Sequence, residues 1–150
     1  MYFCRFMSST QHTDRLPRLN RVLVTVFLFM LIGMAMELYL LGHFEDTQQL
    51  IPLLCIGACL VFAGLVYYKR TLLVQRLFKL ILLLTALSGV YGSYLHIRAN
   101  FEFEQEMKPG LQGWELFTES LSGALPALAP ASMIALALIG YSYYLLIKPQ

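Results

Sequence analysis

Four long runs of apolar residues, separated by shorter polar segments, dominate the 150-residue chain. These runs cover residues 22–41, 50–68, 77–96 and 124–147. An α-helix rises about 1.5 Å per residue, so roughly 20 residues cross the ~30 Å hydrocarbon core of a bilayer. Backbone groups in lipid must be hydrogen-bonded within the protein, which favours helices. The pattern therefore predicts an all-α integral membrane protein, a four-helix transmembrane bundle that forms a single domain over residues 1–150.

The longest connection, residues 97–123, begins with an ambiguous pattern. Residues 101–104 alternate apolar and acidic side chains as a strand does, but no second strand is available to pair with them. A helix instead places His96, Asn100 and Glu104 at positions i, i+4 and i+8, on one face. We therefore expect the third helix to continue for about two to three turns beyond the bilayer.

The second part of this connection predicts a short amphipathic helix. Leu111, Trp114, Phe117 and Leu121 recur at spacings of three and four, and the acidic residues between them fall largely on another face. Tryptophan is typical of the lipid headgroup region. We expect this helix to lie on the outer surface as a lid or brace.

The fourth apolar run opens with two prolines one turn apart, Pro126 and Pro130. Each lacks a backbone N–H and disturbs the carbonyl four residues earlier, at Ser122 and at Pro126. Two interpretations stay open. The prolines start the helix within its first turns, or they create a water-accessible notch beneath the Trp114 helix.

The placement of basic residues predicts the direction of the spans. Only Arg98 and Lys108 fall on one side of a four-span topology, and the other nine basic residues fall on the opposite side. Those nine are Arg5, Arg15, Arg18, Arg21, Lys69, Arg70, Arg76, Lys79 and Lys148. Because lysine and arginine mark the cytoplasmic side, both termini should be cytoplasmic. A bacterial plasma (inner) membrane is the natural setting, with an acidic outer face.

Composition argues against a soluble domain and against a nucleic-acid-binding protein. Only 13% of the residues are charged and 58% are hydrophobic, whereas a soluble domain carries about 25% charged residues. A net charge of +2 without a basic, aromatic-rich patch argues against nucleic acid as a partner. The pair Cys55 and Cys59 is poorly placed for a disulfide on a continuous helix, so we interpret both as small buried residues.

The outer face carries the side chains with the clearest chemistry. If helices one and three end on the same side, two histidines lie at similar depth among carboxylates and an amide. The predicted ligand set is His43, Glu45, Asp46, His96, Asn100 and Glu104. Imidazole with carboxylate suits a divalent metal such as zinc, iron or manganese, and two facing histidines could instead hold haem. The competing interpretation is that both histidines are polar tips at the membrane interface.

Glu37 is the only ionisable residue between Val22 and Leu41. Exposure of such a group to lipid is unfavourable, so it suggests a functional site. The expected partners are Arg98, His96 or a tyrosine of the third helix. Two roles stay open: a proton relay or substrate contact, and a structural ion pair near the helix end.

Two classes of function follow. The absence of a specific catalytic constellation favours a non-enzymatic accessory or partner-binding component, whose partners are the lipid bilayer and other membrane proteins or further copies of this chain. The alternative is a redox, metal- or haem-binding, or small-solute transport protein. That alternative would use the outer histidines and carboxylates together with Glu37.

Overall fold

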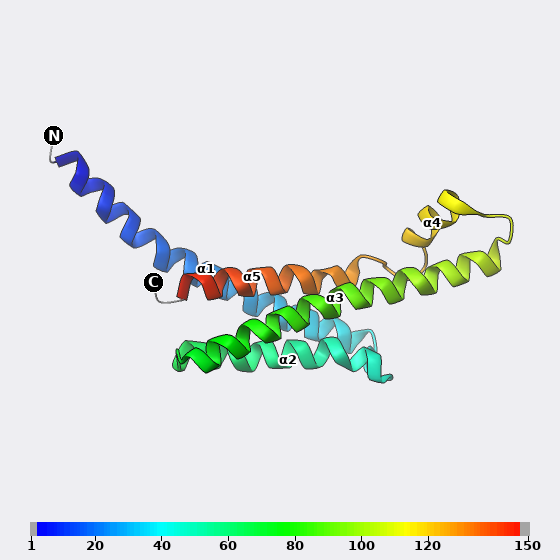
Figure 1. The fold of residues 1–150 in the computed structure, drawn as a ribbon, viewed down its shortest axis with the longest axis horizontal. Helices are drawn as coiled ribbons and strands as arrows, with labels where there is room; N and C mark the ends of the chain where they lie inside the picture. The colour runs from blue at the N-terminus through cyan, green and yellow to red at the C-terminus, as the bar shows by residue number, and fades with distance from the viewer. Residues whose placement is uncertain (1–2, 148–150) are drawn as a thin grey trace.

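The computed structural model describes residues 3–147, with side chains from residue 15 onward, and this part of the chain is helical without strands. The elements are α1 (Phe3–Leu40), α2 (Thr47–Tyr68), α3 (Leu72–Met107), α4 (Gly113–Leu121), the 3₁₀ turn η1 (Ala129–Ala131) and α5 (Ser132–Ile147) (Figure 1). Four segments are long and apolar enough to cross a membrane: α1, α2, α3, and α5 together with η1. Lys148 and the side chains of Cys4, Arg5 and Asp14 lie outside the described residues.

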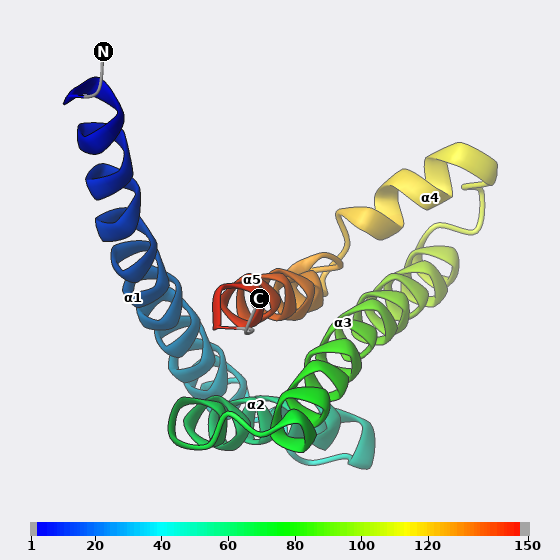
Figure 2. The same cartoon turned by 60° about the vertical axis from the view of Figure 1, so that its left-hand side comes forward.

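The four long helices form an up-and-down bundle. Helix α1 packs on α2, α2 on α3, α3 on α5, and α5 on α1, so each helix has two neighbours (Figure 2). Short connections between consecutive helices make such neighbours antiparallel. We call the end with the α2–α3 connection the basic end, because Lys69, Arg70, Arg76 and Lys79 lie there. The opposite end, with the α1–α2 connection and α4, is the acidic end (Figure 1).

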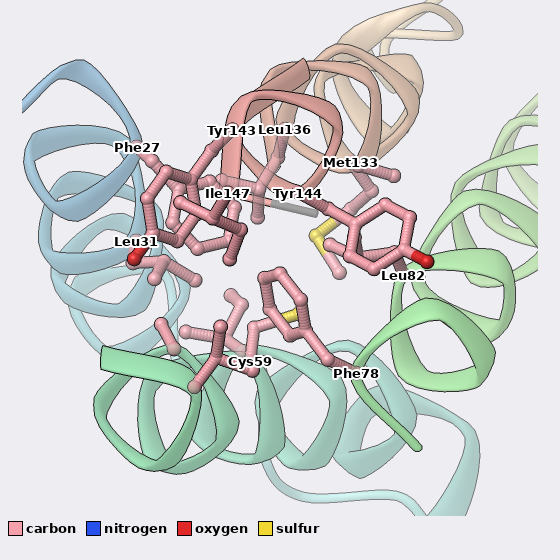
Figure 3. Packing of buried hydrophobic residues seen from close by; sticks show 14 residues of the cluster. Phe27, Leu31, Cys59, Phe78, Leu82, Met133, Leu136, Tyr143, Tyr144 and Ile147 are labelled. Atoms are coloured by element: carbon pink, nitrogen blue, oxygen red, sulfur yellow. The ribbon is translucent and has the colours of Figure 1, made fainter. Parts of the chain in front are cut away.

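The core is built from stripes with a heptad spacing. Alternating steps of three and four residues separate the buried positions of α2 and α3, the spacing that lets antiparallel helices interdigitate. The stripes are Ile56, Cys59, Ala63 and Val66 on α2, and Gln75, Phe78, Leu82, Thr85 and Gly89 on α3. Phe78 is fully buried at the centre, where its ring meets Phe27 of α1 and Tyr143 of α5 edge to face (Figure 3).

The cysteines of α2 are free thiols, as the spacing predicted. Cys59 is fully buried, and its Sγ lies 3.3 Å from the hydroxyl of Thr85. Thr85 in turn donates to the carbonyl of Ile81 at 2.8 Å. The buried hydroxyl is therefore satisfied within the bundle, and Cys59 serves as a small core residue.

Two predicted helix starts differ from the structure. Helix α2 begins at Thr47, three residues before the predicted boundary at residue 50, and it contains Pro52. Helix α5 begins at Ser132, eight residues after the predicted boundary at 124. Pro126 lies before the helix and Pro130 lies within η1, where Ala129 donates to the carbonyl of Pro126 at 3.1 Å. Pro130 therefore lies in the first turn of the fourth span, where a missing N–H is tolerated, but this span begins at Ala129 instead of residue 124.

The first and third helices are longer than the predicted spans. Helix α1 extends upstream of residue 22, and α3 continues unbroken from Leu72 to Met107. The helical interpretation of residues 101–104 is therefore correct. Helix α4 confirms the short amphipathic helix, but its buried residues are Leu116 and Ser120. Trp114, expected near the lipid headgroups, is 74% exposed in the structure.

Glycine allows close contact between α3 and the fourth span. A Cβ on Gly89 would lie 2.8 Å from the carbonyl oxygen of Pro130 and 3.0 Å from Cβ of Met133. Nothing lies within 4 Å of the corresponding Cβ on Gly57 of α2. The two positions therefore differ in available space but not in helical environment.

This difference gives a matched test of the packing. Gly89→Ala should destabilise the bundle by about 1–3 kcal/mol, since backbone atoms that cannot rotate away would have to shift. Gly57→Ala should be neutral or stabilising because alanine favours the helix. Thermal unfolding in detergent measures both. Equal melting temperatures for the two variants would contradict the observed α3–η1 contact.

Candidate functional site

The connection between α1 and α2 holds the first predicted ligands. Gly42 has a φ of +65°, and the N–H of His43 donates to the carbonyl of Leu38 at 2.9 Å while that of Gly42 donates to Tyr39 at 3.1 Å. This is a Schellman motif, in which glycine adopts the left-handed conformation that ends a helix. The first helix thus ends at Leu40, close to the predicted boundary at residue 41, and the motif fixes the position of the His43 backbone.

Glu45 and Asp46 lie at the start of α2. Asp46 is the N-cap residue, and the side-chain oxygen of Gln49 accepts from the N–H groups of Glu45 at 2.9 Å and Asp46 at 3.3 Å. These contacts satisfy backbone donors that a helix start leaves without partners. Both carboxylates are on exposed residues. The two acidic residues therefore belong to a helix start.

On α3, His96, Asn100 and Glu104 share one face as predicted, but this face packs on the segment that returns from α4. Asn100 is 2% exposed. Its amide nitrogen donates to the carbonyls of Ser120 at 2.9 Å and Leu125 at 2.7 Å, and its oxygen accepts from the N–H of Leu125 at 2.9 Å. The amide thus uses three of its hydrogen-bonding positions on the backbone.

His96 contacts the same returning segment one turn closer to the bundle. Its Nδ1 lies 3.1 Å from the carbonyl oxygen of Pro126. That carbonyl would be bonded by residue 130 in a continuous helix, and Pro130 has no N–H to offer. Protonated at Nδ1, the imidazole donates to this carbonyl, which also accepts from the N–H of Ala129 at 3.1 Å. The carbonyl that lacks its helical donor is therefore satisfied by η1 together with a side chain of α3.

Glu104 ends this face with an ion-pair network. Nζ of Lys108 lies 3.0 Å from Glu104 and 2.8 Å from Glu119 of α4. The hydrogen bond that Lys108 donates to Glu119, and next the one that it donates to Glu104, raises the pKa of Lys108. Three consecutive turns of α3 are therefore tied to α4 and to the segment between α4 and η1.

Gly123 makes this contact possible. A Cβ at this position would lie 2.6 Å from Cγ of Asn100. The buried hydroxyl of Ser120 is satisfied locally, since it donates to the carbonyl of Leu116 at 2.6 Å. Sequence reasoning missed Ser120, Gly123 and Leu125, and among them only the glycine is a visible signal.

The two histidines stay near each other, although the six predicted ligands are divided between a helix start and a structural contact. Burial, and then the charge of His96, lowers the pKa of His43. Within the described side chains, no group of three or more His, Cys, Asp or Glu residues is arranged to hold a metal ion. The predicted metal or haem site therefore reduces to the pair His43 and His96.

Glu37 does not meet its expected basic partner. Arg98 pairs with Glu102, its neighbour one turn along α3, at 2.8 Å. Glu37 is exposed on α1, and its carboxylate forms no hydrogen bond or ion pair with residues 15–147. Within the described side chains, Glu37 therefore faces the surroundings of the bundle instead of its expected partners.

Comparison with models of known protein families, with curated proteins and with solved structures gives no match for this chain. The chemistry of the residues and their arrangement thus carry the functional conclusion.

Asn100 offers a direct test of this part of the structure. In Asn100→Ala, the backbone groups of Leu125 and Ser120 lose buried partners, at a cost of about 1–3 kcal/mol. Amide hydrogen exchange over residues 113–125 should accelerate roughly 5- to 100-fold. Gln105→Ala, an exposed position on the same helix, is the control. Unchanged exchange in the Asn100 variant would refute the anchoring role.

Proposed function

We propose that this chain is a non-enzymatic component of a bacterial-type plasma membrane, with both termini cytoplasmic and an outer arm that binds a partner protein. The outer arm comprises residues 97–125, which include the distal part of α3 and all of α4. The single observation that carries this proposal is the bracing of a long helix end by a second helix through Asn100.

Charge supports the proposed orientation. Seven basic side chains described by the structure belong to the N-terminal half of α1 and to the basic end: Arg15, Arg18, Arg21, Lys69, Arg70, Arg76 and Lys79. Only Arg98 and Lys108 lie elsewhere among the described side chains. Such asymmetry is typical of a cytoplasmic basic end. The outer arm then extends into the space outside the membrane.

The length of α3 supports an arm that leaves the bilayer. Its 36 residues rise about 54 Å, whereas the hydrocarbon core is ~30 Å thick. Helix α4 packs along the distal part of α3 (Figure 1). This packing supports a brace rather than a lid as the role of α4. A short helix of nine residues would be marginal alone.

Each helix of the outer arm carries exposed apolar side chains. On α3, helical periodicity places Phe103 and Met107 across the buried stripe from Lys108. On α4, the same periodicity places Phe117 away from Glu119, with Trp114 beside it; their ring centroids are 5.4 Å apart.

These four side chains are all exposed, from 41% for Phe117 to 74% for Trp114. Large exposed apolar patches outside a membrane mark interaction sites, and aromatic side chains dominate binding energy at interfaces. Residues 97–123 also carry five acidic residues against two basic ones. A partner with an apolar pocket and a basic rim would therefore match these side chains in polarity and charge.

A single cross-linking experiment tests both the orientation and the partner. Glu106→Cys on the outer arm is treated in intact cells with a membrane-impermeant, thiol-reactive photo-cross-linker, in a chain whose Cys4 is replaced by serine. We expect reaction at position 106, no reaction for the matched Arg70→Cys variant, and an adduct with a second polypeptide. Trp114→Ala combined with Phe117→Ala should lower the adduct yield by about tenfold or more.

The controls separate the two parts of this proposal. Gln105→Ala should leave the adduct unchanged. Reaction at position 70 but not at position 106 would reverse the orientation. Reaction at position 106 without an adduct would refute the proposal of a partner protein. So would an adduct whose yield does not change when Trp114 and Phe117 are replaced by alanine. An adduct between two copies of this chain would identify the partner as the chain itself.

A second candidate function, a metal- or haem-binding protein for redox chemistry or small-solute transport, draws support from the histidine pair. A hydrogen bond from Nδ1 of His96 to a backbone carbonyl orients the ring and leaves Nε2 available, the arrangement common among metal-bound histidines. His43 is near enough for its pKa to respond to His96. Two imidazoles alone suit haem iron, or a metal that takes further ligands from a substrate.

Metal analysis and a visible spectrum of the purified protein test this candidate. It predicts a stoichiometric transition metal or a haem absorption band, lost in His43→Ala. His96→Asn can still donate to the carbonyl of Pro126, so it separates loss of ligation from loss of the loop contact. Protein that binds neither metal nor haem would refute a stable cofactor at this pair.

A further inference from the structure

A groove runs between α3 and α5 from the basic end of the bundle toward its middle. Its volume is about 460 Å³, within the range of sites that hold small organic ligands. It is open along its side, where Leu80 and Leu138 are both at least half exposed. The groove is therefore accessible from the space that lipid would occupy around the bundle.

The walls of the groove are mainly apolar and follow one face of α3. Leu80, Leu83 and Ala86 line it from α3, and Ala137 and Leu138 line it from α5. The alanines leave room that larger side chains would fill. A single acyl chain, which needs apolar walls and no hydrogen bonds, fits this lining.

The mouth of the groove is basic. Arg76 and Lys79 line the groove where it meets the basic end, one turn apart on α3. Nζ of Lys79 lies 5.7 Å from the ring centroid of Tyr144, so the ammonium is directed toward α5. Within residues 15–147, neither cation has an acidic partner. A phenol from Tyr141 also lines the groove.

The length of the groove matches the depth of one lipid leaflet. Arg76 and Ala86 are ten residues apart, so the groove extends about 15 Å along α3. This length is half of the ~30 Å hydrocarbon core, the depth of one leaflet. A cationic mouth at the interface with an apolar groove one leaflet deep is complementary to a lipid that has an anionic headgroup.

We infer that this groove is a binding site for an anionic phospholipid of the cytoplasmic leaflet, whose phosphate lies at Arg76 and Lys79 and whose acyl chain lies along Leu83 and Ala86. Basic pockets between membrane helices bind such headgroups, and each nearby cation strengthens the attraction. The inference is independent of the outer arm and of its partner.

A second pair of basic residues at the same end serves as a control for nonspecific attraction of anionic lipid to the basic surface. Lys69 and Arg70 carry the same two kinds of charge at the same end, in the connection between α2 and α3. Neither residue lines the groove. A nonspecific effect would depend on both pairs alike, whereas a lipid in the groove would depend on Arg76 and Lys79.

Native mass spectrometry of the full chain in a non-ionic detergent tests the inference with phosphatidylglycerol, phosphatidylcholine of the same acyl chains, and glycerol phosphate. We expect phosphatidylglycerol to bind at least about tenfold more tightly than phosphatidylcholine, and Arg76→Gln with Lys79→Gln to abolish that preference. Lys69→Gln with Arg70→Gln should retain it. Leu138→Trp, which fills the groove from an exposed position, should displace the lipid without removing a charge.

Several outcomes would overturn the inference. Equal binding of the two lipids would exclude recognition of the anionic headgroup, and equal losses in the two charge variants would reveal general surface attraction. Competition by glycerol phosphate as strong as that by phosphatidylglycerol would indicate a free-phosphate site. Dimers without bound lipid that dissociate on Leu138→Trp would show that a second copy occupies the groove.

Discussion

A buried side-chain amide replaces the backbone hydrogen bonds that the chain cannot make where it returns from α4 to the fourth span. Two prolines in five residues prevent a regular helix there, and polar backbone groups near a membrane must still be satisfied. Asn100 bonds both backbone groups of Leu125 as well as the carbonyl of Ser120. The position of α4, the path to α5 and the shape of the outer arm all depend on this contact.

His96 and Glu104, one turn before and one turn after Asn100, also link α3 to α4 and to the segment that follows α4. The imidazole reaches the carbonyl affected by Pro130, and the carboxylate is linked to α4 through Lys108. The polar face of α3 thus has a structural role that accounts for Asn100 and Glu104. It leaves only His43 and the free nitrogen of His96 for ligand chemistry, which is why a partner-binding role is preferred to a metal site.

The two ends of the molecule offer different chemistry. At the acidic end, exposed aromatic side chains accompany an excess of carboxylates, and we propose that this surface binds a protein partner. At the basic end, two cations stand at the mouth of an apolar groove of about 460 Å³, a surface suited to lipid. Helix α3 contributes to both surfaces, because it is long enough to line the groove at the basic end and to form part of the outer arm.

The sequence by itself determined the helical class, the four apolar segments, the end of the first of them near residue 41 and the extension of α3. These features depend on local rules: hydrophobic length and helical periodicity. Tertiary structure decided what the polar face of α3 contacts, where the fourth helix begins and which face of α4 is covered. Helical periodicity shows that side chains share a face, but it does not show which segment packs against that face. Asn100 contacts Leu125 only because the chain folds back after α4, and this long-range packing is not encoded in a local sequence pattern.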